Sequence, residues 1–246
     1  MKVVCVIPAR YHSSRLPGKP LAGIAGKPMI QRVYERASLA RRPDQVLVAT
    51  DHELVFKAVT AFGGQAVMTS PDHPTGTDRL AEVATRLDAD VIINVQGDEP
   101  LIAPEIIDEL AAAFHEDDEL VMATLATPLT AEEQQAPSAV KVVTDLAGYA
   151  LYFSRSLIPY PRYQAEGLTH YKHIGIYAYR RDFLLRYAAL PPTPLEKAES
   201  LEQLRALEHG YRIKVLKTAF QSIGVDTPED LERINAIFAQ QGGLPE

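Results

Sequence analysis

Short apolar runs alternate along the first half of the chain with longer stretches in which apolar residues recur every three or four positions. The apolar runs are typical of buried β-strands, and the periodic stretches predict amphipathic helices. This alternation predicts βαβ units built around a parallel sheet. The predicted strands cover 3–7, 45–50, 65–69 and 91–96, and the predicted helices begin at Pro28 and cover about 53–62 and 77–87.

The pattern changes after a predicted helix at 104–114. Three predicted strands then follow with connections that look too short for crossover helices, so we expect antiparallel pairing and a mixed, mainly parallel sheet with flanking helices. These strands cover 119–127, 140–145 and 149–155; a loop at 159–171, a strand at 172–180, a helix at 181–190, a proline-rich turn and a helix ending at Gly210 follow. No linker divides the chain, so we expect one domain over residues 1–246.

The last predicted helix, 227–239, has a clear start signal. Thr227 is a typical N-cap residue, Pro228 suits the first helical position, and Asp230 stands where a capping box needs an acceptor. Asp226 lies just outside this helix, so its carboxylate is expected to be held in a fixed place. Taken alone, Asp226 also fits an ordinary polar loop.

Composition excludes several classes of protein. The net charge of −7 argues against a nucleic-acid-binding surface and against attachment to anionic lipid. The single cysteine, Cys5, lies in an apolar run, so disulfides and thiolate metal sites are excluded. No apolar run approaches the ~18 residues of a membrane span. We therefore expect a cytoplasmic protein with neither nucleic acid nor membrane as a partner.

Against this acidic background, residues 1–34 contain no Asp or Glu. Within them, IPARYHSSRLPGKPLAGIAGKP (7–28) joins the first predicted strand to the first helix, where open α/β sheets bind ligands. Arg10, Arg15 and Lys19 supply charge, and the small residues let backbone N–H groups approach phosphate oxygens. The segment contains neither GxxxxGK[ST] nor GxGxxG, which argues against kinases and dinucleotide binding. A nucleoside triphosphate site and a solvated basic loop remain as alternatives.

A second signal is VIINVQGDEP (91–100), in which a buried-looking strand ends in Gly97 and Asp98. A carboxylate at the tip of a central parallel strand suits a hard divalent cation that bridges phosphate oxygens. GDEP is also good turn chemistry by itself. Pairing with the basic segment favours the metal site, since a triphosphate site needs both cations and a metal ligand.

Other polar segments are less specific. SPDHPTGTDRL (70–80) either reads a base or turns the chain, and His173 more often plays a structural than a catalytic role in such a strand. Glu202 and Gln203 lie beside apolar residues, at a cleft edge or in solvent.

Seven segments together resemble the 3-deoxy-manno-octulosonate (Kdo) cytidylyltransferases, the CMP-Kdo synthetases, in their order and approximate spacing. They are IPARYHSSRLPGKPL, TGTDRL, NVQGDEPLI, YALYFSRSLIP, KHIGIYAYR, LEQLR and GVDTPEDL, and they span Ile7 to Leu231. The resemblance implies a glycosyltransferase-A-like, Rossmann-like nucleotidyltransferase fold, a homodimer, Mg²⁺ dependence and a role in lipopolysaccharide biosynthesis. It implies that CTP and Kdo give CMP-Kdo and diphosphate, with a sugar-binding and dimerisation subregion at about 120–215.

The resemblance also assigns residues to roles. It implies catalysis by Arg10, Lys19, Asp98 and Asp226, with Mg²⁺ bound by the two aspartates; CTP bound by Arg10, Arg15, Lys19, Ser70, Gly76, Arg79 and Gln96; and the sugar acid bound by Arg155, His173, Tyr177, Glu202 and Gln203.

The exact acceptor stays open, because the loop at 159–171 departs from the better-matched motifs. The alternatives are a related acid such as 8-amino-Kdo or a nonulosonic acid, another cytidylyltransferase of the same fold, or a non-catalytic nucleotide-binding module. KHIGIY and LEQLR favour Kdo, and the joint presence of the basic residues with Asp98 and Asp226 argues against a non-catalytic module.

Overall fold

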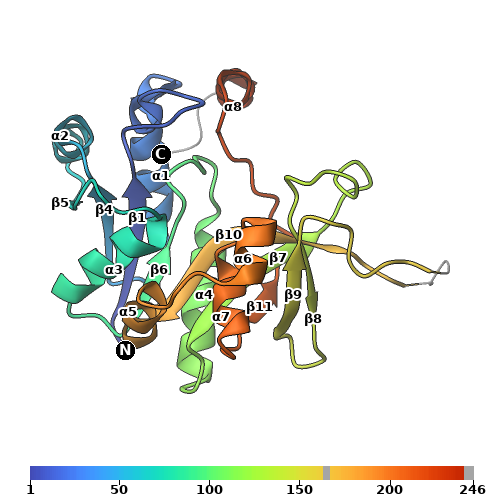
Figure 1. The fold of residues 1–246 in the computed structure, drawn as a ribbon. Coiled ribbons are helices and arrows are strands. Elements are labelled where there is room, and N and C mark those ends of the chain that lie inside the picture. Colours follow the sequence, from blue (N-terminus) through green and yellow to red (C-terminus); the bar gives the residue numbers. More distant parts are fainter. Residues whose placement is uncertain (163–166, 241–246) are drawn as a thin grey trace.

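The computed structural model describes residues 1–162 and 167–240. Within them, a central sheet with the strand order β11-β7-β10-β6-β1-β4-β5 runs through the molecule (Figure 1). The strands are β1 (Val3–Ala9), β2 (Gly23–Ile24), β3 (Lys27–Pro28), β4 (Gln45–Thr50), β5 (Ala66–Met68), β6 (Val91–Asn94), β7 (Met122–Pro128), β8 (Lys141–Thr144), β9 (Ala150–Ser154), β10 (Tyr171–Arg180) and β11 (Lys214–Lys217). The helices are a 3₁₀ turn (Lys19–Leu21), α1 (Met29–Ala37), α2 (Glu53–Ala61), α3 (Gly76–Arg86), α4 (Pro104–Glu116), α5 (Arg181–Ala188), α6 (Pro194–Glu199), α7 (Gln203–Glu208) and α8 (Pro228–Gln240).

The sheet is mixed, as the sequence predicts. Strands β6, β1, β4 and β5 are parallel neighbours, and β10 lies antiparallel between β6 and β7. Strands β8 and β9 extend the sheet from β10 as an antiparallel pair. The prediction omitted β11, which pairs parallel with β7 at the sheet edge.

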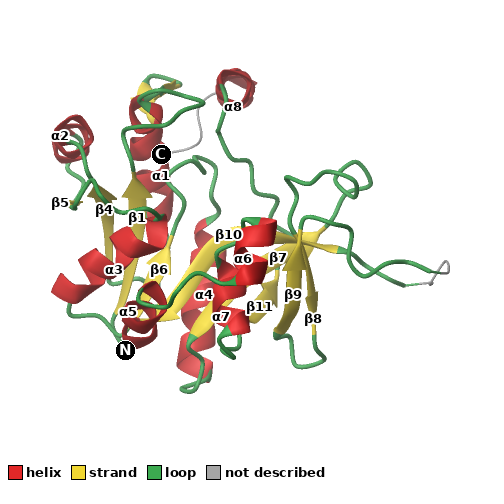
Figure 2. Cartoon of the chain, in the orientation of Figure 1, coloured by secondary structure: helices red, strands yellow, loops and turns green. Residues whose placement is uncertain are grey.

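Helices cover both faces of the sheet (Figure 2). Alternation along β1 sends Val3, Cys5 and Ile7 into one core with α1, α2 and α4, and Val4 and Val6 into another with α3, α5 and α7. All five side chains are fully buried, so β1 has the continuous apolar sequence of a strand covered on both sides. The carboxyl end of β1 is thereby fixed in place for the segment that follows it.

A third core joins the basic segment to the end of the chain. Leu16, Ile24 and Met29 pack against Val225 and the α8 side chains Ile234 and Phe238. At the start of α8, the predicted capping box forms, because the Asp230 carboxylate accepts from the Thr227 N–H and the Asp230 N–H donates to Thr227 Oγ1, both at 3.2 Å.

The prediction of one continuous helix ending at Gly210 is wrong, because the structure has two short helices, α6 and α7, in that region. Helix α6 ends at Glu199, its C-cap residue Ser200 adopts a left-handed conformation at φ 51°, and α7 begins only at Gln203. A left-handed residue cannot continue a right-handed helix, so the chain turns before α7.

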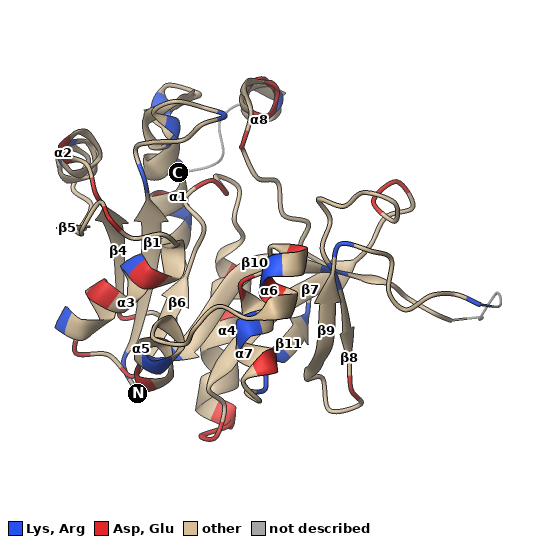
Figure 3. Ribbon diagram, viewed as in Figure 1, with Lys and Arg blue, Asp and Glu red and all other residues tan. Residues whose placement is uncertain are grey.

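Parts of the predicted loop at 159–171 project from the body beyond β8 and β9 (Figure 1). Residues 163–166 of that loop lie outside the described residues. Strands β1, β4, β5, β6 and β7 carry no Asp, Glu, Lys or Arg, and charges of both signs are dispersed over the helices and loops (Figure 3). None of the helices in the described part of the chain is both long and apolar enough to cross a bilayer.

Candidate functional site

Two adjoining cavities open where β1 and β6 end. The first, which we call the basic cavity, has a volume of about 340 Å³. The second, which we call the tyrosine cavity, has a volume of about 210 Å³. Pro8, Gly76 and Gln96 line both. The basic cavity is also lined by Ala9, Arg10, His12, Ser13, Ser14, Arg15, Lys19, Pro20, Gly97, Asp98 and Asp226, and the tyrosine cavity by Thr77, Asn94, Tyr177, Tyr179, Tyr187, Glu202 and Gln203.

Lys19 is the centre of the charged groups in the basic cavity. Its Nζ lies 2.6 Å from Asp98 Oδ2 and 2.9 Å from Asp226 Oδ1. Arg15 Nη2 lies 3.2 Å from the other oxygen of Asp226. Burial alone would lower the pKa of Lys19, but the two carboxylates outweigh burial and raise that pKa. The ammonium therefore stays charged beside them.

Backbone contacts bring the two aspartates together from distant parts of the sequence. The Val225 N–H donates to the Asp98 carbonyl at 2.9 Å, and the Asp226 N–H donates to the Asp230 carboxylate at 3.2 Å. Gly97 allows β6 to end against β1, because a Cβ at this position would lie 2.7 Å from the Pro8 carbonyl oxygen. The predicted convergence of Asp98 with the basic segment is therefore present.

The two carboxylates fit a magnesium site by their chemistry and convergence. Both point oxygens at one cation, the Lys19 ammonium. No group of three or more His, Cys, Asp or Glu side chains within 1–162 and 167–240 forms a metal cluster. Mg²⁺ suits a site of one or two carboxylates, since it keeps several waters and binds substrate phosphates. Neighbouring Glu99 is buried, and burial raises the pKa of its carboxyl to about 7.

Arg10 lines the basic cavity and has an unpaired hydrogen-bond donor that an anion could accept from. Its Nη2 is buried and has no hydrogen-bond partner within the described structure. A buried donor of this kind is costly unless something accepts its hydrogen. His12, Ser13 and Ser14 line the same cavity, so it is rich in groups that can contact phosphate oxygens.

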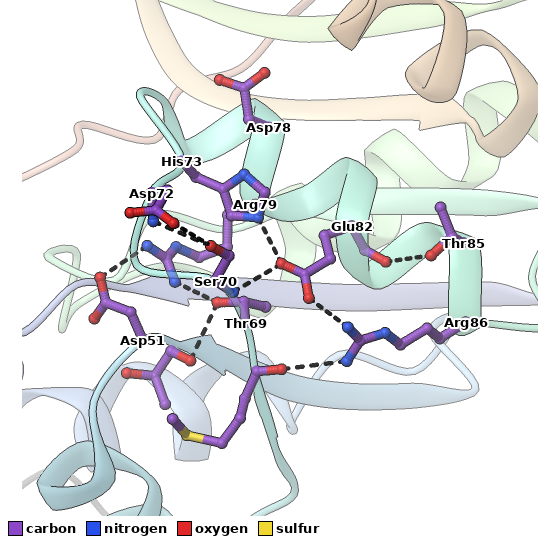
Figure 4. A network of polar contacts seen from close by, with 12 residues as sticks. Asp51, Thr69, Ser70, Asp72, His73, Asp78, Arg79, Glu82, Thr85 and Arg86 are labelled. Atoms are coloured by element: carbon purple, nitrogen blue, oxygen red, sulfur yellow. Dashed lines mark hydrogen bonds and ion pairs between the residues drawn. The ribbon is translucent and has the colours of Figure 1, made fainter.

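Arg79 and Ser70 line neither cavity in the described structure. Both belong to a network of polar contacts that includes Asp51 and Glu82 (Figure 4). Arg79 is completely buried; its Nη2 donates to Asp51 Oδ2 at 2.9 Å and its Nη1 donates to Thr69. The Ser70 N–H, in the loop that leads into α3, donates to the Glu82 carboxylate on that helix at 2.9 Å. These contacts position the loops beside the cavities, and nucleotide contacts by Arg79 and Ser70 stay predictions.

The tyrosine cavity brings together Tyr177, Glu202 and Gln203 from the predicted sugar set. Burial raises the pKa of Glu202 and of Tyr177. Gln203 Nε2 and Asn94 Oδ1 are buried and have no hydrogen-bond partner within the described part of the chain. One unpaired donor and one unpaired acceptor suit a ligand with several hydroxyl groups.

The other two residues predicted to bind sugar, Arg155 and His173, lie outside the lining of both cavities. The Arg155 guanidinium donates to the carbonyls of Glu199, Ser200 and Pro137, at 2.7, 3.3 and 3.0 Å. His173 contacts the ring of Tyr177, with ring centroids 5.2 Å apart. The contacts of Arg155 and His173 with sugar remain predictions.

Several lining residues were not singled out by sequence reasoning. Asn94 ends β6 and offered one signal, an amide at the tip of a strand that is otherwise apolar. Tyr179 and Tyr187 gave none, because their apolar surroundings in β10 and α5 are typical of core residues. The structure adds them to the site because β10 and α5 pack beside β6.

The chain has close relatives among known proteins. The family model described as "Cytidylyltransferase" matches residues 4–215. The 3-deoxy-manno-octulosonate cytidylyltransferases of Geobacter sulfurreducens and Geotalea uraniireducens are 55% and 56% identical to it, over 95% of this chain and 98% of each relative.

Solved structures show the same relationship. CMP:2-keto-3-deoxy-manno-octonic acid synthetase complexed with CTP matches with a TM-score of 0.94 and 53% identity, over 98% of this chain and 100% of that one. The 4-diphosphocytidyl-2C-methyl-D-erythritol synthase of Anaerococcus prevotii, at 15% identity and a TM-score of 0.63 over 97% of this chain and 96% of that one, shares the fold. The chain thus has the predicted nucleotidyltransferase fold and belongs to the 3-deoxy-manno-octulosonate cytidylyltransferase family.

Proposed function

We propose that this protein is a nucleotidyltransferase that transfers CMP from CTP to 3-deoxy-manno-octulosonate and releases diphosphate. The observation that carries the proposal is the convergence of Lys19, Asp98 and Asp226 in the basic cavity, which adjoins the tyrosine cavity. Relatives about 55% identical over nearly the whole chain carry the name of this activity.

In this reaction, the oxygen of the anomeric hydroxyl group of the sugar acid forms a bond to the α-phosphorus of CTP. The bond between the α-phosphorus and the bridging oxygen of diphosphate breaks, and the hydroxyl proton passes to solvent. Such reactions depend mainly on positioning and on neutralising charge, so cationic side chains matter more than a nucleophilic residue.

The chain supplies positioning from both cavities. Arg10, Arg15 and Lys19 would hold the triphosphate in the basic cavity, with Gln96 between the two cavities. Gln96 Nε2 donates to the Gly175 carbonyl at 2.8 Å, which leaves its Oε1 as an acceptor for a donor on the nucleotide. Tyr177, Glu202 and Gln203 would face the sugar acid, as expected from the resemblance.

Asp98 and Asp226 would hold Mg²⁺. When bound, this ion neutralises phosphate charge and lowers the pKa of a coordinated hydroxyl. Lys19 stands between the same carboxylates and would turn its ammonium toward the phosphates. Because the bound ion would lower the pKa of the attacking hydroxyl, the reaction needs no separate general base, and the residues expected from the sequence include none.

The test is diphosphate release from CTP and Mg²⁺ with a panel of acceptors: Kdo, 8-amino-Kdo and a nonulosonic acid. We expect release with Kdo and little release when ATP, GTP or UTP replaces CTP. Preference for another acid would correct the acceptor, and no release with any acid would refute the enzymatic function.

We also propose that the protein is a cytoplasmic homodimer that acts in lipopolysaccharide biosynthesis, with sugar binding and dimerisation in the subregion 120–215. Exposed apolar side chains in this region, Leu146 and Leu151, support a contact with a second chain. Sedimentation velocity over a range of concentrations tests it: a dimer is expected, and a monomer at all concentrations would refute the dimer.

A further inference from the structure

Strand β10 carries an irregularity beside the tyrosine cavity. Ile174 is in register with Leu125 of β7, and Tyr177 is in register with Thr124, so Gly175 and Ile176 form a bulge between them. Bulges redirect side chains and occur often beside active sites. Here the bulge separates His173 from Tyr177, which lines the cavity.

Thr124 lies opposite this bulge and is completely buried. Its Oγ1 is 3.1 Å from the Ile174 carbonyl oxygen, 2.8 Å from the Ile176 carbonyl oxygen and 2.9 Å from His173 Nε2. One side chain therefore contacts the backbone of the bulge on both sides of Gly175 as well as the imidazole that precedes it.

The hydrogen count at Thr124 favours one direction for the contact with His173. A threonine hydroxyl has one hydrogen to donate, and a carbonyl oxygen can only accept. If that hydrogen went to His173 Nε2, both carbonyl oxygens of the bulge would face Oγ1 with no hydrogen between them. If it goes to a carbonyl of the bulge, Oγ1 can accept a hydrogen from Nε2 as well, so more of these groups are satisfied.

His173 is neutral at physiological pH, because burial lowers its pKa to about 3. A neutral imidazole carries one hydrogen, so a hydrogen on Nε2 leaves Nδ1 as an acceptor. The ring also contacts Phe153 and Tyr177, with centroids 5.1 and 5.2 Å away, which limits its rotation.

We propose that Thr124 is a positioning residue that holds His173 as the Nε2–H tautomer and so presents Nδ1 as an acceptor for a hydroxyl group of the sugar acid. The assignment of the tautomer stands on the contacts of Thr124. The contact with a sugar hydroxyl rests on the proposed function and on the packing of His173 against the ring of Tyr177, which lines the tyrosine cavity although His173 does not.

The tautomer can be measured without any substrate, by two-bond ¹H–¹⁵N correlation spectra of the imidazole at neutral pH. We expect the Nε2–H pattern for His173 in the wild-type protein. Thr124→Val keeps the shape but removes the hydroxyl, and we expect it to change His173 to the Nδ1–H form or to a mixture. Thr124→Ser keeps the hydroxyl and should restore the wild-type pattern.

Kinetics test the second half of the proposal. For Thr124→Val, we expect the KM for Kdo to rise about tenfold, the effect of one lost hydrogen bond, with the KM for CTP unchanged. Thr124→Ser should recover most of the loss. Thr127→Val is the matched control, because Thr127 is also buried on β7 but bonds Gln221 instead of His173.

An Nδ1–H pattern in the wild-type protein, or an Nε2–H pattern that survives Thr124→Val, would overturn the positioning role. A changed tautomer with an unchanged KM for Kdo would overturn the contact with substrate. If the tautomer changes as expected but no sugar acid reacts with the wild-type protein, the proposed function fails and the positioning of His173 stands. Since the wild-type spectrum alone decides the tautomer, an unfolded valine variant leaves that test intact.

Discussion

Neutralising Asp51 should destabilise the protein without removing a side chain that lines either cavity. Asp51 follows β4, and its Oδ2 accepts from Arg79 Nη2 at 2.9 Å (Figure 4). The Arg79 side chain is 0% exposed and that of Asp51 is 10% exposed. Asp51→Asn preserves the size of the side chain and one oxygen acceptor, but it removes the negative charge.

The expected loss of stability follows from the surroundings of the Arg79 guanidinium once the negative charge of Asp51 is removed. Burial lowers the pKa of Arg79, Asp51 opposes that effect, and the positive charge of Arg10 adds to it. Breaking a buried ion pair by removing one partner costs about 3–5 kcal/mol. Because asparagine still accepts a hydrogen bond, we expect the lower value, about 3 kcal/mol, which lowers the Tm by roughly 6–12 °C for a chain of this length.

The assay is urea and thermal unfolding at neutral pH, followed by circular dichroism. Asp72→Asn is the matched control, because Asp72 is an exposed carboxylate in the same polar network. The unfolding free energy of this variant should fall by less than about 0.5 kcal/mol. A loss below about 1 kcal/mol in Asp51→Asn would refute the reasoning. Normal stability together with a more than tenfold loss of CTP affinity would instead place Arg79 in contact with the nucleotide.

Three further predictions concern charged groups. Asp98→Ala or Asp226→Ala should abolish diphosphate release while CTP still binds, because the metal acts in the transition state; a near-normal kcat would contradict this assignment. Lys19→Met should reduce kcat/KM about 100-fold or more, whereas Lys27→Met, a lysine paired with Glu35 outside both cavities, should stay within about threefold; similar effects of the two would place Lys19 outside the chemistry. Burial alone would raise the pKa of Glu196, but the hydrogen bonds and positive charge of Arg205 outweigh burial and hold that pKa below its ordinary value. The pair therefore adds stability that is fully present above the ordinary pKa of a glutamate and disappears as the pH falls through the lowered pKa. The unfolding free energy of wild type and Glu196→Gln should converge in acid, and a constant difference from pH 7 to pH 3 would contradict this.

The parallel half of the fold could be predicted because its strands and helices carry clear periodic patterns. Strand β11 could not, since Lys214–Lys217 has only four residues, two of them lysines, and looks like an exposed turn. The break between α6 and α7 was missed because Ser200 is not a glycine, and its left-handed conformation depends on contacts from elsewhere. Arg155 bonds to its carbonyl across 45 residues of sequence.

The basic cavity could be predicted from the sequence more fully than the tyrosine cavity. Arg10 follows β1 directly, Lys19 lies in the segment that joins β1 to α1, and Asp98 lies in the turn after β6. The carboxyl ends of the parallel strands β1 and β6 meet at one sheet edge. The tyrosine cavity forms only where β10 runs antiparallel beside β6 and α5 packs nearby. Periodicity does not reveal such an insertion, so Tyr187 looked like an ordinary core residue.

The docking of α8 explains how a residue near the end of the chain enters a site built at its beginning. Asn235 on α8 accepts from the Ala25 N–H at 2.9 Å and donates to the Gly23 carbonyl at 3.1 Å. Phe238 and Ile234 are buried against the basic segment, and each such side chain contributes about 1.5–3 kcal/mol.

These contacts hold the start of α8 and therefore the Asp226 carboxylate that precedes it. The match to the cytidylyltransferase family model ends at residue 215, so Asp226 lies outside the matched range. Arg15 and Lys19 both pair with Asp226 from the basic segment, and Leu16 of the same segment packs with the α8 side chains in the third core. The packing of α8 thus supports the pairing of these charges: without the helix, Asp98 would be the only carboxylate paired with Lys19 among the residues that the structure describes.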